Sequence, residues 1–501
     1  MIEADVHSSL RDFLRQYGNR NFPHHLTMAR LIARALRLGR PALMQTGSSV
    51  SKYCLSYLTP ILLGDWSVVI VAPASTQQYL LEKEIPQLLR WLGKTKTVRI
   101  GDRWIAQDQL LLTSPHSWLS DRLEKRGKFP TQIPTIIDRA DHLEEWTREL
   151  LTIRITPADW DALLSSIPQH QELIRNTRIK LTKSIFARPE NPYRNYILLD
   201  SELDLIKELC ARLSQDQLLT SKLQQFWQQI ADKSKITWIA RDREQGSFTI
   251  NLAPARVSNY LQPIWQQQPV VVIGSFLDTE VDATTYQQQV GLNTEILSLK
   301  FAPNRQNNHI QLYLPDRFPM PNSPDYRAAF IEESLLLVSL CANMKRLIVV
   351  IADDVPLQGQ VGSVLAAEFG SRVKVENINV SDFSILICGW SFWKLNQEKL
   401  PIPQLLIIAT LPIPSLENPL VANLVNYYKN QRQDWFRLYL LPTALKTLEQ
   451  TVVPLREAQS IIALLDNRVN FRSYGKTILS ALEPCARINY IDPTWFGYPN
   501  S

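Results

Sequence analysis

The chain has little glycine, no paired cysteines and no metal-binding histidine motif. Glycine contributes 16 of 501 residues, roughly half the usual ~7%, so few loops can wrap a ligand with glycine backbone. The five cysteines stand singly and form no Cys-x-x-Cys pair, which argues against a zinc ribbon and a disulfide framework. The seven histidines form no His-Glu-x-x-His motif. We therefore expect no metal site built from cysteine or histidine.

Long apolar segments are also missing. The longest runs, such as residues 335–341 and 347–352, are far shorter than the ~20 residues that a membrane span needs. Residues 1–10 include Glu3 and Asp5 and lack the apolar core of a secretory signal. These features predict a soluble, cytoplasmic protein. The net charge of +6 favours polyanionic partners only mildly, and an ordinary solvated surface explains it as well.

Short apolar strands alternate with helical patterns in both halves of the chain. Such alternation is typical of βαβ units and a parallel sheet. Between them, leucine, glutamine and charged residues in a helical pattern predict an insertion, and a segment rich in proline and asparagine predicts a connector. We predict an α/β fold with two parallel-sheet domains. The first comprises residues 1–142 and 236–302, with a helical insertion at 143–235; a connector at 303–326 leads to the second, 327–501.

The turn after the first predicted strand, residues 47–53, has part of a phosphate-binding pattern. Such a loop wraps phosphates with backbone N–H groups, neutralises them with a lysine and holds Mg²⁺ with the next hydroxyl residue. Gly47 and Lys52 stand at the required separation. Ser51 replaces the glycine before the lysine, however, and Tyr53 replaces the hydroxyl residue. Alone, the pattern fits an ordinary strand-to-helix turn better than a phosphate-binding loop.

A second motif lies at residues 133–145, where an apolar strand ends in Asp138 and Arg139-Ala140-Asp141-His142 follows. With this motif the chain resembles the DinG-type DNA helicases of superfamily 2, in which the strand ends in Asp-Glu-Ala-His. Further similar segments occur in the family's order. They are residues 274–277, 384–393, 409–420, 465–468 and 473–475. Ordered similarity over nearly the whole chain is more specific than any single motif.

The resemblance implies two RecA-like domains with ATP in the cleft between them and single-stranded DNA across the top. It also implies a helical, Arch-like insertion, in keeping with residues 143–235. Many members carry a four-cysteine iron–sulfur cluster just before the Asp-Glu-Ala-His strand. Residues 93–132 contain no cysteine, so no iron–sulfur cluster is expected. The expected partners are single-stranded or forked DNA and DNA-repair proteins, with the chain itself a monomer.

The residues that would carry out catalysis depart from the family pattern. Arg139 replaces the catalytic glutamate, residues 394–397 replace Glu-Gly-x-Asp, and only Gln450 and a shifted Arg456 remain of the arginine-finger motif. His25 takes the place of the adenine-reading glutamine. The resemblance implies ATP and, with less support, Mg²⁺ as ligands. The nucleotide-binding positions that it implies are Gly47, Ser48, Ser49, Ser51, Lys52, Tyr53, Asp138, Gln450 and Arg456.

These departures predict a pseudo-helicase. Such a protein keeps the helicase fold and binds DNA or a repair partner, but it has lost most or all ATP hydrolysis. A missing arginine finger alone costs roughly 10³–10⁵ in rate in related phosphoryl-transfer systems. An active ATP-dependent helicase and a protein-interaction scaffold remain as alternatives. Arg139 has two expected placements, a bidentate pair with Asp138 in place of Mg²⁺ or a turn to solvent. Any bound nucleotide should not require Mg²⁺.

Candidate DNA-binding residues form a basic stripe and an aromatic group. Arg30, Arg34 and Arg37 fall at helical spacing on one face. Trp393, with Trp390 and Phe392 close by, offers rings on which bases could stack. A solvated helix face and an ordinary core are the alternative interpretations.

Overall fold

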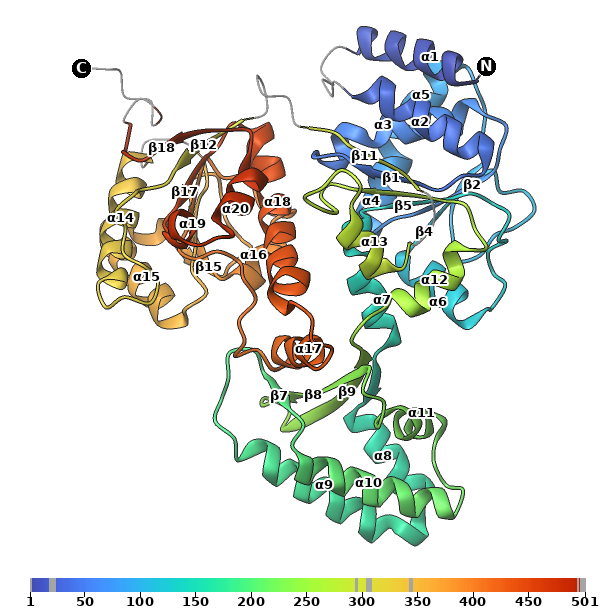
Figure 1. The fold of residues 1–501 in the computed structure, drawn as a ribbon, viewed down its shortest axis with the longest axis vertical. Coiled ribbons are helices and arrows are strands. Elements are labelled where there is room, and N and C mark those ends of the chain that lie inside the picture. Colours follow the sequence, from blue (N-terminus) through green and yellow to red (C-terminus); the bar gives the residue numbers. More distant parts are fainter. Residues whose placement is uncertain are drawn as a thin grey trace.

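The computed structural model describes residues 2–17, 24–292, 296–302, 309–341, 346–492 and 495. In these residues two seven-stranded parallel sheets lie beside each other, with a smaller antiparallel sheet below them in Figure 1. The predicted α/β fold with two parallel sheets is therefore confirmed. Every helix in the described parts of the chain is too short or too polar to cross a membrane.

The first parallel sheet has the strand order β11-β1-β10-β5-β2-β4-β3. Alternate residues of its central strands face opposite layers of helices, so both faces are buried, as expected for a parallel sheet. The strands are β1 (Ala42–Gln45), β2 (Val68–Val71), β3 (Val98–Ile100), β4 (Leu110–Thr113), β5 (Thr135–Asp138), β10 (Val270–Gly274) and β11 (Leu297–Lys300).

Five helices cover one face of this sheet and four cover the other. On the first face lie α1 (Ile2–Gln16), α2 (His25–Leu38), α3 (Val50–Leu63), α4 (Ala74–Tyr79) and α5 (Ile85–Leu92). On the second lie α6 (Pro115–Glu124), α7 (Leu143–Leu151), α12 (Ser258–Trp265) and α13 (Thr284–Val290).

The second parallel sheet has the order β14-β15-β13-β16-β17-β12-β18. Its strands are β12 (Ile310–Tyr313), β13 (Ile348–Ile351), β14 (Val373–Val375), β15 (Ile385–Cys388), β16 (Leu405–Ile408), β17 (Ile461–Leu464) and β18 (Cys485–Ile488). Its helices are α14 (Tyr326–Cys341), α15 (Val355–Phe369), α16 (Trp390–Asn396), α17 (Pro419–Asn430), α18 (Leu441–Glu457), α19 (Arg468–Phe471) and α20 (Gly475–Leu482).

One strand of the second sheet lies where the sequence predicted only a connector. Strand β12 falls within residues 303–326 and pairs with both β17 and β18. Its four residues are flanked by proline and asparagine, which concealed a strand too short to give a periodic pattern. Residues 303–308 of that connector lie outside the described residues.

The inserted segment contains a sheet as well as helices. Strands β6 (Ile153–Ile155), β7 (Asn195–Ile197), β8 (Lys235–Asp242) and β9 (Ser247–Pro254) form it in the order β6-β9-β8-β7. The sequence predicted only helices at 143–235 and returned residues 236–302 to the first sheet, whereas β8 and β9 pair with β7 and β6. Two three-residue strands give no detectable alternation. The limits of the predicted domains stay a prediction.

The helices of this segment are α8 (Pro157–Ser166), α9 (Gln171–Phe186), α10 (Asp200–Gln215) and α11 (Ser221–Gln229). Its sheet contacts α17 of the second domain, as Figure 1 shows. The Asn423 side chain donates to the Thr237 carbonyl at 2.6 Å, and Leu424 packs against Ile236 and Ala253. The insertion therefore joins both parallel-sheet domains.

Candidate nucleotide cleft

The turn between β1 and α3 lies at the carboxyl end of the first sheet. Gly47 adopts a left-handed backbone with φ of 58°, a conformation that glycine tolerates without strain. Its N–H donates to the Ser275 carbonyl at 2.9 Å. Because β10 is the neighbour of both β1 and β5, the turn and Asp138 at the end of β5 come to the same edge of the sheet.

Asp138 lies in a closed cluster with two tyrosines of α3. The Tyr53 hydroxyl donates to Oδ1 of Asp138 at 2.5 Å and the Tyr57 hydroxyl donates to Oδ2 at 2.7 Å. The backbone N–H of Arg139 donates to Oδ1 at 2.8 Å. All three side chains are buried. We call Asp138, Tyr53 and Tyr57 the tyrosine cluster.

The tyrosine cluster does not fit a bound Mg²⁺ ion. The ion keeps several waters and needs carboxylate oxygens that can accept them, but both oxygens of Asp138 accept tyrosine hydroxyls. Tyr53 itself stands where the metal-binding hydroxyl was expected. Among the described residues, no group of three or more His, Cys, Asp or Glu is placed to hold a metal ion.

Burial shifts the ionisation of every member of this cluster. Desolvation raises the pKa of Asp138, although the three hydrogen bonds and the charge of Arg139 act in the opposite direction. Burial, followed by the charge of Asp138, raises the pKa of Tyr53 and of Tyr57 well above the usual value. The tyrosines therefore keep their protons and act as donors.

A carboxylate of the second domain occupies the start of α3. Glu457, the last residue of α18, accepts hydrogen bonds from Ser49: from the backbone N–H at 3.2 Å and from the hydroxyl at 3.0 Å. Burial raises the pKa of Glu457, whereas the Ser49 bonds and the charge of Lys52 lower it. Exposed N–H groups at a helix start favour an anion, and here that anion belongs to the chain itself.

Arg139 takes neither of its expected placements. Its side chain forms an ion pair with Glu398 of the second domain, instead of pairing with Asp138 or turning to solvent. Its backbone is left-handed, with φ of 58°. Burial lowers its pKa, but the hydrogen bond and charge of Glu398 outweigh this effect and raise it. In place of the expected catalytic carboxylate, this position therefore holds the Arg139 guanidinium, which pairs with Glu398 of the second domain.

Two further contacts join the domains near this point. The Gln450 amide donates to Oδ2 of Asp141 at 2.6 Å, which brings together the altered arginine-finger motif and the segment that follows β5. The Lys446 ammonium lies 3.2 Å from Oε1 of Glu145. Both Gln450 and Lys446 belong to α18, which therefore lies along the carboxyl edge of the first sheet.

Arg456 is not placed as an arginine finger, contrary to expectation. Its guanidinium is buried, donates to Glu449 at 2.8 Å and donates to the carbonyl of Ala481 at 2.6 Å and of Glu483 at 2.8 Å. These bonds tie α18 to α20 within the second domain. The neighbouring residue Glu457 is the one that contacts Ser49, in the turn between β1 and α3.

A cavity of about 500 Å³ lies between the two domains, beside the turn that joins β1 to α3. Ser48, Ser49, Ser51 and Tyr53 line it from the first domain. The second domain contributes Gln397, Glu398, Gln450, Val453, Pro454 and Glu457. The structure therefore gathers five of the nine predicted nucleotide-binding positions at one cleft: Ser48, Ser49, Ser51, Tyr53 and Gln450. Asp138 lies just beneath it, Arg456 is turned away, and neither Gly47 nor Lys52 lines it.

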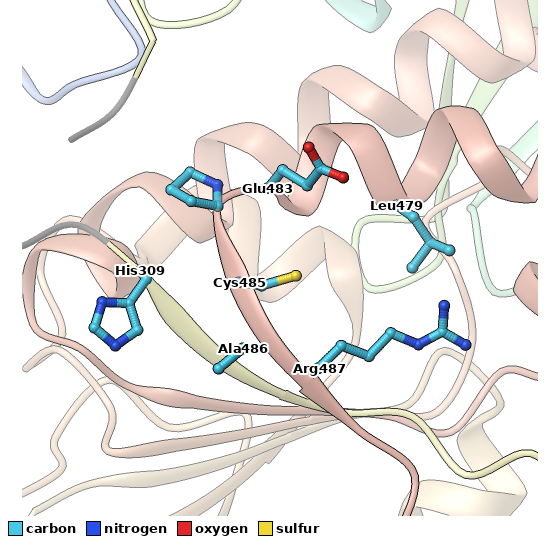
Figure 2. Close-up of a pocket in the computed structure, with 7 residues that line it drawn as sticks. His309, Leu479, Glu483, Cys485, Ala486 and Arg487 are labelled. Carbon is cyan, nitrogen blue, oxygen red and sulfur yellow. The ribbon is translucent and has the colours of Figure 1, made fainter. Parts of the chain in front are cut away.

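A larger surface hollow of about 650 Å³ lies elsewhere, along β18. Figure 2 shows Cys485 and Arg487 pointing to one side of β18 and His309 lying on the other. Burial raises the pKa of the Cys485 thiol, which makes it a poor nucleophile. None of the predicted nucleotide-binding residues lines this hollow.

The DNA-binding candidates differ in exposure. Arg30, Arg34 and Arg37 are exposed on α2, although Arg37 donates to Glu3 at 2.6 Å. Trp393 is buried, and its indole N–H donates to the Thr451 hydroxyl at 3.1 Å. A ring enclosed in this way cannot stack on a base, so the expected stacking role of Trp393 is wrong. His25 is also buried, with its ring bonded to Ser56 at 2.9 Å.

Sequence reasoning assigned no role to Tyr57 of the tyrosine cluster or to Glu398 and Glu457, which line the cleft. Tyr57 follows Tyr53 by four residues, the spacing that places two side chains on one helix face. Glu398 directly follows the altered motif at 394–397, and Glu457 is the last position of the altered motif at 450–457. Their positions at or beside altered motifs could have drawn attention to Glu398 and Glu457. The sequence did not predict that their side chains point across the cleft.

Comparisons with known proteins find similarity to DNA helicases. A family model for the helicase C-terminal domain matches residues 402–485. The ATP-dependent DNA helicase YoaA of Haemophilus influenzae is 23% identical over 254 residues, covering 48% of this chain and 39% of that protein. YoaA of Escherichia coli is equally similar, with 40% of that protein covered. The match thus spans about two fifths of the length of these relatives.

Solved structures share the overall fold. Xpd4 of S. tokodaii has a TM-score of 0.58 and 14% identity, covering 93% of this chain and 100% of that chain. An apo XPD structure has a TM-score of 0.60 and 13% identity, with 92% and 100% covered. At such identities the likeness concerns the fold alone. The findings together confirm the resemblance to DinG-type helicases of superfamily 2.

Proposed function

We propose that this chain is a pseudo-helicase, a DinG-type helicase homologue that binds DNA while ATP hydrolysis is lost or very slow. The observation that carries the proposal is the tyrosine cluster, in which both oxygens of Asp138 accept hydroxyls. Phosphoryl transfer from ATP depends on a metal that bridges the phosphates and neutralises developing charge. A carboxylate enclosed by tyrosines supplies no such anchor.

The groups facing the cleft add to this argument. A base that orients the attacking water is expected beside Asp138, yet Arg139 occupies that position and pairs with Glu398. An arginine finger is expected on α18, yet Arg456 is enclosed by Glu449 and two carbonyls. Losing the finger alone costs roughly 10³–10⁵ in rate, and the losses act on one reaction step.

Glu457 further disfavours a bound triphosphate. Its carboxylate accepts from Ser49, at the helix start where phosphate oxygens would accept. A second anion in the same place would be repelled, and Lys52 would have to neutralise both. ATP binding should therefore be weak and independent of Mg²⁺.

The DNA-binding part of the proposal is supported by the relatives, which are described as DNA helicases. Single-stranded or forked DNA is the proposed ligand, and a DNA-repair protein is a further proposed partner. The exposed Arg30 and Arg34 on α2 are suited to phosphate contacts. A net charge of +6 is compatible with this role.

The deciding experiment is ATP turnover by the purified protein, with and without single-stranded DNA and Mg²⁺, beside the variant Lys52→Ala. We expect the two proteins to release phosphate at the same background rate. DNA-stimulated turnover that disappears in the variant would establish the active-helicase alternative instead.

DNA binding is measured separately, by fluorescence anisotropy with a labelled single-stranded oligonucleotide between 50 and 200 mM salt. We expect log affinity to fall linearly with log salt, by about 0.7 for each phosphate neutralised. Arg30→Ala combined with Arg34→Ala should reduce that slope. Absence of salt-dependent binding would favour the scaffold alternative.

A further inference from the structure

Several of the contacts that join the two parallel-sheet domains fall on positions where this chain departs from the helicase motifs, or close to them. Arg139 replaces the catalytic glutamate and binds Glu398. Glu457 is the last position of the degraded arginine-finger motif and binds Ser49. The same positions that lack catalytic groups therefore supply bonds across the cleft.

Glu457 completes the start of α3 in a way that the first domain does not. The helix begins at Val50, and the side chain of its N-cap residue, Ser49, makes no capping bond. The first N–H groups of a helix have no partner within it. The Ser49 N–H and hydroxyl instead donate to Glu457, so a carboxylate takes the place of a phosphate.

The remaining contacts also join the two domains, and two of them pair opposite charges. Arg139 pairs with Glu398 and Lys446 lies beside Glu145. The Gln450 amide donates to the Asp141 carboxylate. Together with the Ser49–Glu457 bonds, these contacts join the first domain to α18 and to the end of α16.

We propose that these four contacts form an interdomain clasp that keeps the two parallel-sheet domains closed without nucleotide. Domains that close around a ligand ordinarily do so because the ligand contacts both sides. Here the Glu457 carboxylate of the second domain takes the part of such a ligand by binding Ser49 of the first domain. Arg139 of the first domain adds an ion pair with Glu398 of the second. The clasp concerns the arrangement of the domains and does not depend on whether the chain binds DNA.

The clasp makes the closed arrangement insensitive to ATP. A ligand shifts a conformational equilibrium only by its differential affinity for the two states. When the closed state already satisfies Ser49 with Glu457, a triphosphate must displace that carboxylate to gain the same bonds. We therefore expect no further closure when ATP is added.

The first test is small-angle X-ray scattering of the full chain, with and without ATP and Mg²⁺. The radius of gyration should be the same in both conditions and should match the closed structure. A chain that is extended alone and becomes compact with ATP would overturn the proposal. ATP turnover decides the proposed function separately, so the two ideas can fail independently.

The second test asks whether the contacts act as one unit. The variant Glu398→Lys breaks the pair with Arg139, and amide hydrogen exchange is then measured at Ser49, in a different contact. We expect exchange at Ser49 to become about tenfold faster, equivalent to ~1.4 kcal/mol. The matched control Glu417→Lys changes an exposed glutamate of the same domain and should leave Ser49 unchanged.

Unchanged exchange at Ser49 in a folded Glu398→Lys variant would also overturn the proposal. Glu398 is about half exposed, and circular dichroism reports whether the variant folds. If it does not, the scattering of the unaltered chain decides alone.

Discussion

The tyrosine cluster and the Arg139–Glu398 pair of the interdomain clasp differ in burial. Asp138, Tyr53 and Tyr57 are enclosed within the first domain, whereas Glu398 of the clasp is 54% exposed and Arg139 is 23% exposed. Water cannot replace a bond lost inside the domain, but it can replace one lost in the cleft. The cluster should therefore determine whether the domain folds, and the clasp should determine how the domains are arranged.

The largest expected effect is on the cluster. Tyr53→Phe or Tyr57→Phe removes one hydroxyl and leaves one oxygen of Asp138 with fewer donors in a buried site. Each change should lower the free energy of unfolding by about 1–3 kcal/mol. Urea unfolding measures it.

The matched control for these variants is Tyr490→Phe, which removes the hydroxyl of an exposed ring. It should change the free energy of unfolding by no more than about 0.5 kcal/mol. If the tyrosines of α3 behaved like Tyr490, the contrast between an enclosed cluster and an open cleft would be broken.

The next effect is a pH dependence that belongs to Asp138. Its pKa is raised in the folded state, mainly by burial, so the folded chain holds this proton at pH values where the unfolded chain has released it. The stabilisation is fully present below the unfolded pKa of about 3.9. It is lost as the pH rises through the folded pKa, by at most about 1.4 kcal/mol per pH unit.

The measurement compares the unaltered chain with Asp138→Asn at several pH values above 4. The free energy of unfolding of the unaltered chain should fall with rising pH relative to the variant. Asp282→Asn, at an exposed carboxylate of the same domain, should give no such trend. A constant difference between the unaltered chain and Asp138→Asn would mean that burial does not control this carboxyl.

The cluster and the clasp also differ in how far the sequence predicts them. Buried strands that end at Gln45 and Asp138 were predictable from apolar runs, and parallel pairing then brings Lys52 and Asp138 to one sheet edge. The sequence showed that Tyr53 replaces the hydroxyl residue that would bind Mg²⁺. It did not show that the Tyr53 hydroxyl bonds to Asp138. Tyr57 was overlooked because no motif position falls on it.

The clasp was not predictable, because its bonds join residues far apart in the chain. Ser49 and Glu457 are 408 positions apart, and no periodicity relates them. Side-chain direction decides the outcome at the neighbouring Arg456, which turns into the second domain while Glu457 turns out of it. That choice depends on how α18 packs against α20, which a local pattern does not contain.

The smallest expected effect is on the clasp itself, at the pair of Arg139 and Glu398. Because the Glu398 side chain is about half exposed, Glu398→Gln should change the free energy of unfolding by less than about 1 kcal/mol. Raising the salt from 0.1 to 1 M shortens the screening length from about 10 to about 3 Å, so the difference from the unaltered chain should shrink further. Glu417→Gln serves as the matched control in the same urea titrations.

A loss at Glu398 as large as that at Tyr57 would mean that the cleft contributes to the folding core. The domains would then unfold as one unit, and a separate role for the clasp in arranging them would have no basis. A small loss that vanishes in high salt, together with faster exchange at Ser49, has the opposite meaning. That result would mean that the tyrosine cluster stabilises the fold of the first domain, whereas the clasp stabilises the closed arrangement of the two domains. Both nevertheless include residues of altered helicase motifs.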